Sequence, residues 1–250
     1  MSAAEKTGGR PFDRHALELW LRSPRGNRLL SVEEHELARA LPELFGRHLL
    51  QIGSWGRGTR LLAASQMLHS AVLGTVRGFD AQALAVPEHV PVLNKSVDAV
   101  LLPHSLEFAR SPQSVLREVN RILTDRGRLL ILGFNPWSAW GVRHRIGMPY
   151  RAFPPGARLV SVRRLRDWLE LLDFEVCDLR RFGVGFPWRA PHSADAGGLF
   201  GGLAEGYLLI AKKRVVPMTL VGRRLRAVIK PAIGAAPATE ARRSTPAPIT

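Results

Sequence analysis

The chain has 250 residues, of which 46% are hydrophobic and 23% charged, and its formal net charge is +15. This length is enough for one α/β domain with a full-sized core or for two small domains, and the composition is ordinary for a globular protein. The sequence has neither an apolar run of about 20 residues nor an apolar signal core after Met1, so we expect no membrane span and no export. Its one cysteine, Cys177, can form neither an internal disulfide nor a zinc cluster, which favours the cytoplasm.

About half of the excess charge lies at the C-terminal end. Residues 212–250 contain nine Lys and Arg against one acid, Glu240, and therefore carry +8. A basic tail of this kind either binds phosphates of a nucleic acid or is simply solvated. The expected organisation is a disordered N-terminus over residues 1–10, a domain over 11–213, and a disordered tail rich in Pro and Ala over 214–250.

In chain order, apolar periodicity predicts alternating helices and strands. A capping box at Ser31 and Glu34 predicts the start of the second helix, and Gly46 its end. Ser111 and Pro112 predict the start of the fourth, and Arg126-Gly127 its stop. The expected helices cover residues 12–21, 31–45, 59–69, 112–123 and 162–172. The expected strands cover residues 48–52, 71–73, 99–102, 128–132, 174–179 and 207–211.

Strands that alternate with helices predict a mainly parallel, doubly wound, Rossmann-like sheet with helices on both faces. The clearest unit is the strand, helix and strand between residues 99 and 132, whose crossover should be right-handed. Ligands of such sheets bind beyond the carboxyl ends of the strands. The turns after Ile52, Leu102 and Leu132 are therefore the candidate sites.

The turn after Ile52 reads Gly53-Ser54-Trp55-Gly56-Arg57-Gly58. Its glycines let a ligand approach the backbone closely, and the expected helix behind it would present free amides and a positive dipole end. A nucleoside-type cofactor that carries a carboxylate would suit this turn. An ordinary tight turn without a ligand explains the same glycines.

Three segments resemble the class I S-adenosylmethionine (SAM) dependent methyltransferases, and the type 11 methyltransferase domain in particular. They are the strand and glycine turn at residues 49–58, the strand at 96–100, and the run from Leu106 to Leu129. The resemblance covers roughly residues 15–213 and is most specific over 97–141, where it points to a bacterial subgroup. It implies a sheet of about seven strands, the last antiparallel, with SAM lying over the first and fourth strands.

The resemblance also implies roles for individual residues. His104 would be the catalytic base, since an imidazole at the mouth of the site can deprotonate a hydroxyl or amine. A histidine that only satisfies a backbone group is the alternative. The residues expected to bind SAM are Gln51, Gly53, Ser54, Gly56, Gly58, Pro103 and His104. The residues expected to line the substrate pocket are Glu107, Asn135 and Trp137.

Four positions depart from the family pattern. Gln51 replaces the usual acid of the first strand, and Trp55 interrupts the glycine pattern with a side chain that is large enough to fill cofactor space. No acid follows the second strand at Gly74-Thr75, and Val86 stands where an adenine-contacting acid is expected. Each lost polar contact would cost roughly 1–3 kcal/mol of binding.

Three functions are therefore weighed. The first is a SAM-dependent methyltransferase that acts on a small molecule or a nucleic acid. The second is a protein of the same fold that has lost SAM binding and acts as a binding or regulatory protein. The third is an unrelated α/β protein whose main functional feature is the basic tail.

Overall fold

The computed structural model describes residues 14–56, 58–75, 81–139, 141–142, 156–184 and 204–214. All of them belong to one unit, Met1–Val215, and a second unit, Val216–Thr250, lies outside the described residues. The predictions for the N-terminus and for the tail beyond residue 214 also fall outside them.

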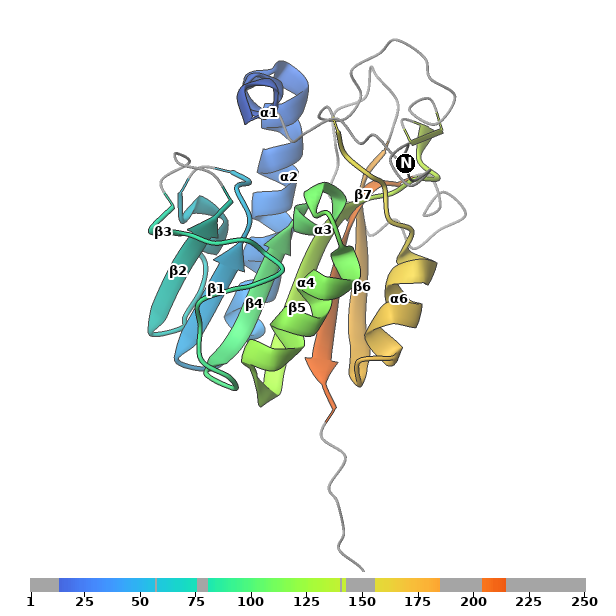
Figure 1. Ribbon diagram of the computed structural model, residues 1–250. Coiled ribbons are helices and arrows are strands. Elements are labelled where there is room, and N and C mark those ends of the chain that lie inside the picture. Colours follow the sequence, from blue (N-terminus) through green and yellow to red (C-terminus); the bar gives the residue numbers. More distant parts are fainter. Residues whose placement is uncertain are drawn as a thin grey trace, which may run out of the picture. The chain divides into compact units, whose positions relative to one another are not determined.

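The centre of the described unit is a seven-stranded sheet in the order β3-β2-β1-β4-β5-β7-β6 (Figure 1). Neighbouring strands from β3 to β5 run parallel, whereas β7 is antiparallel to both β5 and β6. The predicted doubly wound α/β fold with an antiparallel last strand is confirmed. The strands are β1 (His48–Ile52), β2 (His69–Gly74), β3 (Ala83–Leu84), β4 (Val97–Pro103), β5 (Leu123–Phe134), β6 (Phe174–Val184) and β7 (Ala204–Lys213).

Helices cover both faces of the sheet (Figure 1). Alternate residues of β4 point to opposite faces, so Leu101 packs in the core on the α2 side and Leu102 in the core on the α4 side. Both leucines are fully buried, as expected for a parallel strand covered on two faces. The helices are α1 (Arg14–Arg22), α2 (Pro24–Ala40), α3 (Ser105–Phe108), α4 (Pro112–Ile122) and α6 (Val162–Glu170), with 3₁₀ turns η1 (Leu41–Glu43) and η2 (Arg60–Leu62).

Helix α4 begins where the sequence predicts. The Ser111 hydroxyl accepts a hydrogen bond from the Ser114 amide, and Pro112 occupies the first turn. The helix ends at Ile122 rather than at the predicted stop, because β5 starts at the next residue and takes up residues 126 and 127. The helix and the following strand are therefore joined without a loop.

Two helix predictions are wrong. Helix α2 starts at Pro24, because the Ser23 hydroxyl caps it by accepting from the Gly26 amide. Ser31 lies inside the helix, where its hydroxyl donates to the Asn27 carbonyl instead of forming a capping box. Between residues 59 and 69 the chain forms only the 3₁₀ turn η2.

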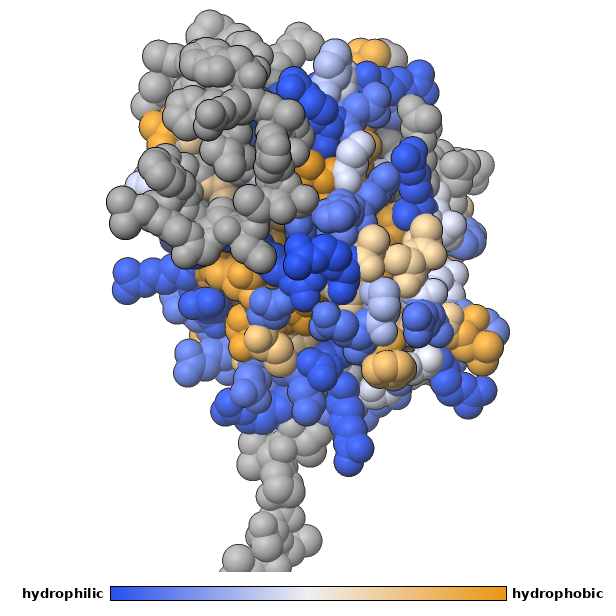
Figure 2. Space-filling view, turned by 180° about the vertical axis from the view of Figure 1, so that it is seen from behind, coloured by the Kyte–Doolittle hydropathy of each residue, from blue (hydrophilic) through white to orange (hydrophobic). Residues whose placement is uncertain are grey.

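The surface of the described unit is mixed in character. On the face opposite to that of Figure 1, hydrophobic residues lie in small groups between hydrophilic ones (Figure 2). None of the helices in the described ranges is long and apolar enough to cross a membrane. Scattered apolar side chains of this kind are normal for a protein surface.

Candidate functional site

A pocket of about 700 Å³ lies beyond the carboxyl ends of β1, β2 and β4. The strand order reverses between β1 and β4, and ligands of doubly wound sheets bind at such a switch point. The pocket falls in the size range of small-molecule sites. Its lining residues are Gly53, Ser54, Trp55, Thr75, Ala85, Val86, Pro87, Glu88, His89, Pro103, Ser105, Phe108, Ala109, Arg110, Ser111 and Ser114.

The glycine turn forms one wall of this pocket. Gly53 has a φ of +123°, and a Cβ atom there would overlap the Ser105 hydroxyl. Only glycine therefore fits where the turn after β1, the first turn, meets the turn after β4, the second turn. The Ser105 hydroxyl donates to the Ile52 carbonyl. The Ser54 hydroxyl accepts from the Thr75 amide at 3.0 Å. These contacts fix the ends of β1, β2 and β4 relative to one another.

Gln51 supports the same turn from below. Its amide Nε2 donates to the carbonyls of Gly53 and Trp55, at 3.3 and 3.1 Å. Its Oε1 is buried and has no hydrogen-bond partner in the described part of the chain. A glutamine in place of the family's acid therefore keeps the turn in shape and leaves one free acceptor beneath it.

The opposite wall is held by Glu88. Its Oε1 accepts from the backbone amides of Arg110 and Ser111, at 3.1 and 3.3 Å. This carboxyl group thus ties the segment after β3 to the start of α4. Among the lining residues that the structure describes, Glu88 is the one acid and Arg110 the one guanidinium.

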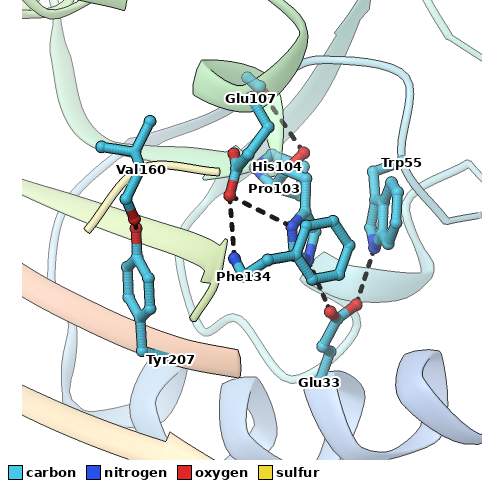
Figure 3. Close-up of polar contacts among 9 residues, drawn as sticks. Glu33, Trp55, Pro103, His104, Glu107, Phe134, Val160 and Tyr207 are labelled. Carbon is cyan, nitrogen blue, oxygen red and sulfur yellow. Dashed lines mark hydrogen bonds and ion pairs between the residues drawn. The ribbon is translucent and has the colours of Figure 1, made fainter. Parts of the chain in front are cut away.

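A buried polar cluster lies behind the first wall (Figure 3). Glu33 of α2 is fully buried, and its carboxylate contacts two side chains. Oε2 accepts a hydrogen bond from Trp55 Nε1 at 2.7 Å, and Oε1 lies 2.7 Å from His104 Nε2. The imidazole ring of His104 packs against the rings of both Trp55 and Phe134, with centroids 4.2 and 4.0 Å away.

Glu107 completes the cluster from α3. Its Oε1 accepts from the Phe134 amide at 2.9 Å and lies 3.6 Å from His104 Nδ1. Burial by itself lowers the pKa of His104, but the charge of Glu33 and the contacts with Glu107 outweigh burial and raise this pKa from 6.5 to about 9. His104 is therefore a cation at neutral pH, ion-paired on both sides.

The structure separates the residues expected to bind SAM into two groups. Gly53, Ser54 and Pro103 line the pocket, whereas Gln51, Gly56, Gly58 and His104 do not. The imidazole of His104 is fully buried and protonated at neutral pH, which favours a structural role over that of a base. Its catalytic role stays a prediction.

The residues expected to contact substrate do not meet at the pocket. Glu107 belongs to the buried cluster. Asn135 is also buried, and its side-chain amide donates to the Ala204 carbonyl at 2.9 Å. Trp137 is 63% exposed. Asn135 and Trp137 adjoin each other beyond β5, since the Trp137 amide donates to the Asn135 side chain at 3.1 Å.

Glu33 was missed by the sequence reasoning, although a signal was present. It lies four residues after Leu29 and four before Leu37, on the buried face of α2. A carboxylate on the apolar face of a helix needs a buried partner. The wrong start assigned to the helix concealed this position, because Glu33 then fell within the first turn.

Comparisons with known proteins agree with this geometry. The family described as a methyltransferase domain matches residues 53–131, from the glycine turn to β5. The uncharacterized protein YafS of Escherichia coli is 34% identical over 205 residues, which are 82% of this chain and 84% of YafS. The chain belongs to the type 11 family of class I SAM-dependent methyltransferases. An uncharacterized protein of Mycobacterium bovis is 34% identical over 183 residues, and the match spans 61% of its length.

Solved structures show the same fold at low sequence identity. A SAM-dependent methyltransferase from Archaeoglobus fulgidus has a TM-score of 0.59 at 19% identity, over 80% of this chain and all of that one. A geranyl diphosphate C-methyltransferase from Streptomyces coelicolor, solved with S-adenosyl-L-homocysteine, has a TM-score of 0.51 at 16% identity. The match covers 83% of this chain and 92% of that one. The [4+2]-cyclase SpnF has a TM-score of 0.53 at 17% identity, over 78% of this chain and 84% of that one. The fold therefore hosts more than one reaction.

Proposed function

We propose that this protein is a methyltransferase that binds SAM in the pocket beyond β1, β2 and β4. The observation that supports this proposal best is the position of the pocket, at the point where the strand order reverses and between the glycine turn and the start of α4. Membership of the family makes SAM the expected ligand.

The lining suits the nucleoside part of SAM. Apolar side chains such as Pro87 and Phe108 offer flat surfaces to a purine, and the hydroxyls of Ser54 and Thr75 offer partners to a ribose. Glu88 is an acid among the described lining residues, and we propose that it takes the role of the missing acid after β2. When bound, SAM supplies a methyl group on an activated sulfonium, so positioning of the acceptor contributes much of the rate.

Trp55 does not favour the alternative in which SAM binding is lost. Trp55 is one of the lining residues, but the residue as a whole is only 2% exposed, and its indole packs against Trp20 and Phe134 in the core on the α2 side. Its bulk is therefore accommodated within the core, and the pocket in front of the turn keeps a volume of about 700 Å³.

The test is calorimetric titration of the full chain with SAM and with S-adenosylhomocysteine. We expect binding in roughly the micromolar range, and about tenfold or weaker binding in Ala85→Trp, where the added ring fills the pocket. Leu84→Trp is the matched control, because Leu84 is exposed and does not line the pocket. No binding to a folded wild-type protein up to millimolar ligand would overturn the proposal.

The acceptor that we propose is a small molecule or a nucleic acid. The net charge of +8 over residues 212–250 supports the nucleic acid. Methyl transfer to RNA or DNA that is lost when residues 215–250 are removed would favour it, whereas transfer to a small molecule by both forms of the protein would favour the other class.

A further inference from the structure

We propose that Glu33 is a positioning residue for the SAM pocket, because its one carboxylate holds the two turns that form the inner wall of that pocket. This inference rests on the proposed function, and it gives helix α2, which does not line the pocket, a part in shaping the binding site. Glu33 lies on α2 and is not among the residues that line the pocket. In the described part of the chain, its carboxylate reaches the pocket wall through Trp55 and His104.

The first turn is held through Trp55. The indole N–H donates to Glu33 Oε2, and the Trp55 carbonyl accepts from Gln51. The same turn supplies Gly53 and Ser54 to the pocket wall. A shift of the indole therefore changes the position of the residues that face the ligand.

The second turn is held through His104. This residue adopts a left-handed conformation, with a φ of +53°, and lies between Pro103 and Ser105, both of which line the pocket. Non-glycine residues adopt this conformation at a cost, so surrounding contacts must maintain it. Here these contacts are the Glu33 carboxylate, two aromatic rings packed against the imidazole, and the hydrogen bond from the His104 amide to the Leu132 carbonyl.

The charge of Glu33 matters as well as its shape. Two ionisable groups face the imidazole directly, Glu33 from α2 and Glu107 from α3. Burial and the charge of Glu107 raise the pKa of Tyr207 of β7. Burial and the charge of Glu33 likewise raise the pKa of Glu205 of β7, against the effect of its ion-pair partner Arg25 of α2. Without the charge of Glu33, His104 loses its proton at a lower pH, and the second turn loses an ion pair.

Glu33→Gln separates charge from shape. Glutamine has the same length and still accepts a hydrogen bond from the Trp55 indole, but it carries no charge. Glu36→Gln is the matched control, because Glu36 lies on the same helix, is 4% exposed and contacts Arg39 rather than either turn.

The experiment follows two signals of the full-length protein by NMR, the Trp55 indole N–H and the Ser105 amide, through a titration from pH 6 to 10. In the wild type we expect both to shift together with a midpoint near 9, the pKa of His104. In Glu33→Gln we expect the common midpoint to fall by about one pH unit or more, because one of the two ion pairs is gone. Glu36→Gln should keep the wild-type midpoint.

Calorimetry at pH 8 then measures SAM affinity in the same three proteins. We expect roughly tenfold weaker binding in Glu33→Gln and an unchanged affinity in Glu36→Gln. A folded Glu33→Gln with the wild-type midpoint, or with wild-type affinity, would overturn the inference. If the wild type binds no SAM while the NMR midpoints shift as expected, the proposed function fails and the link from Glu33 to the two turns stands.

Discussion

Helices α2 and α4 lie on opposite faces of the same sheet and are attached to it by different forces. The buried face of α4 is entirely apolar, with Val115, Leu116, Val119 and Ile122 fully buried. The buried face of α2 includes Glu33 and Glu36 among its leucines. Apolar burial is non-directional and insensitive to pH, whereas a buried ion pair is directional and depends on protonation. The stability contributed by the α2 side should therefore depend on individual polar atoms and on pH. The stability contributed by the α4 side should depend on the volume of its buried side chains.

The largest expected effect is that of Glu33→Ala. This change leaves the Trp55 indole and one side of the His104 imidazolium unpaired in the core, and breaking a buried pair typically costs about 3–5 kcal/mol. The free energy of unfolding, measured by chemical denaturation at pH 7, should fall by that amount. A loss below about 1 kcal/mol would mean that α2, like α4, is held by apolar burial alone.

The next effect is a pH dependence specific to the α2 side. Because the pKa of His104 is raised in the folded protein, its protonation stabilises the fold fully below pH 6.5, and this stabilisation is lost as the pH rises through about 9. The size expected from this shift is on the order of 3 kcal/mol.

Unfolding measured at several pH values between 6 and 10 checks this slope. In His104→Asn this dependence of stability on pH should be absent, while asparagine still tolerates the left-handed backbone conformation. Leu116→Ala on α4 should lower stability by about 2–5 kcal/mol at every pH and keep the slope. Equal slopes in the wild type and His104→Asn would show that His104 does not titrate differently in the folded protein.

The smallest effect is expected at the neighbouring carboxylate. Glu34 is partly exposed and pairs with the exposed Arg60 at 2.8 Å. Because solvent screens such pairs, Glu34→Ala should change the free energy of unfolding by less than about 1 kcal/mol. A loss as large as that of Glu33→Ala would contradict the distinction between the two sides of α2.

The part of the fold that the sequence predicted best is the β4–α4–β5 unit. An all-apolar helix face with Ser111-Pro112 at its start, between two continuous apolar strands, is a strong local signal. The prediction of a helix over residues 59–69 is wrong, because local helix propensity did not determine the structure of that segment, which forms only a 3₁₀ turn. Helix α2 was placed too late because Ser31-Glu34 matches a capping box, although Ser23-Pro24 supplies the stronger start.

The site could be predicted only in part. Gly53, Ser54 and Pro103 follow from the rule that ligands bind beyond strand ends. The cluster of Glu33, His104 and Trp55 joins segments that are far apart in the sequence, and no local pattern encodes such a contact. The burial of His104 could likewise not be read from its place after a strand.

The bond between Glu33 and His104 also bears on how the chain folds during synthesis. The two residues are 71 positions apart, so at about 5–20 residues per second the ribosome needs roughly 4–14 s to add the partner of Glu33. Long-range contacts of this kind close late, because chain entropy must be lost first. Until β4 has been synthesised, the Glu33 carboxylate on the apolar face of α2 has no His104 to pair with, and burying this face before then would leave an uncompensated charge.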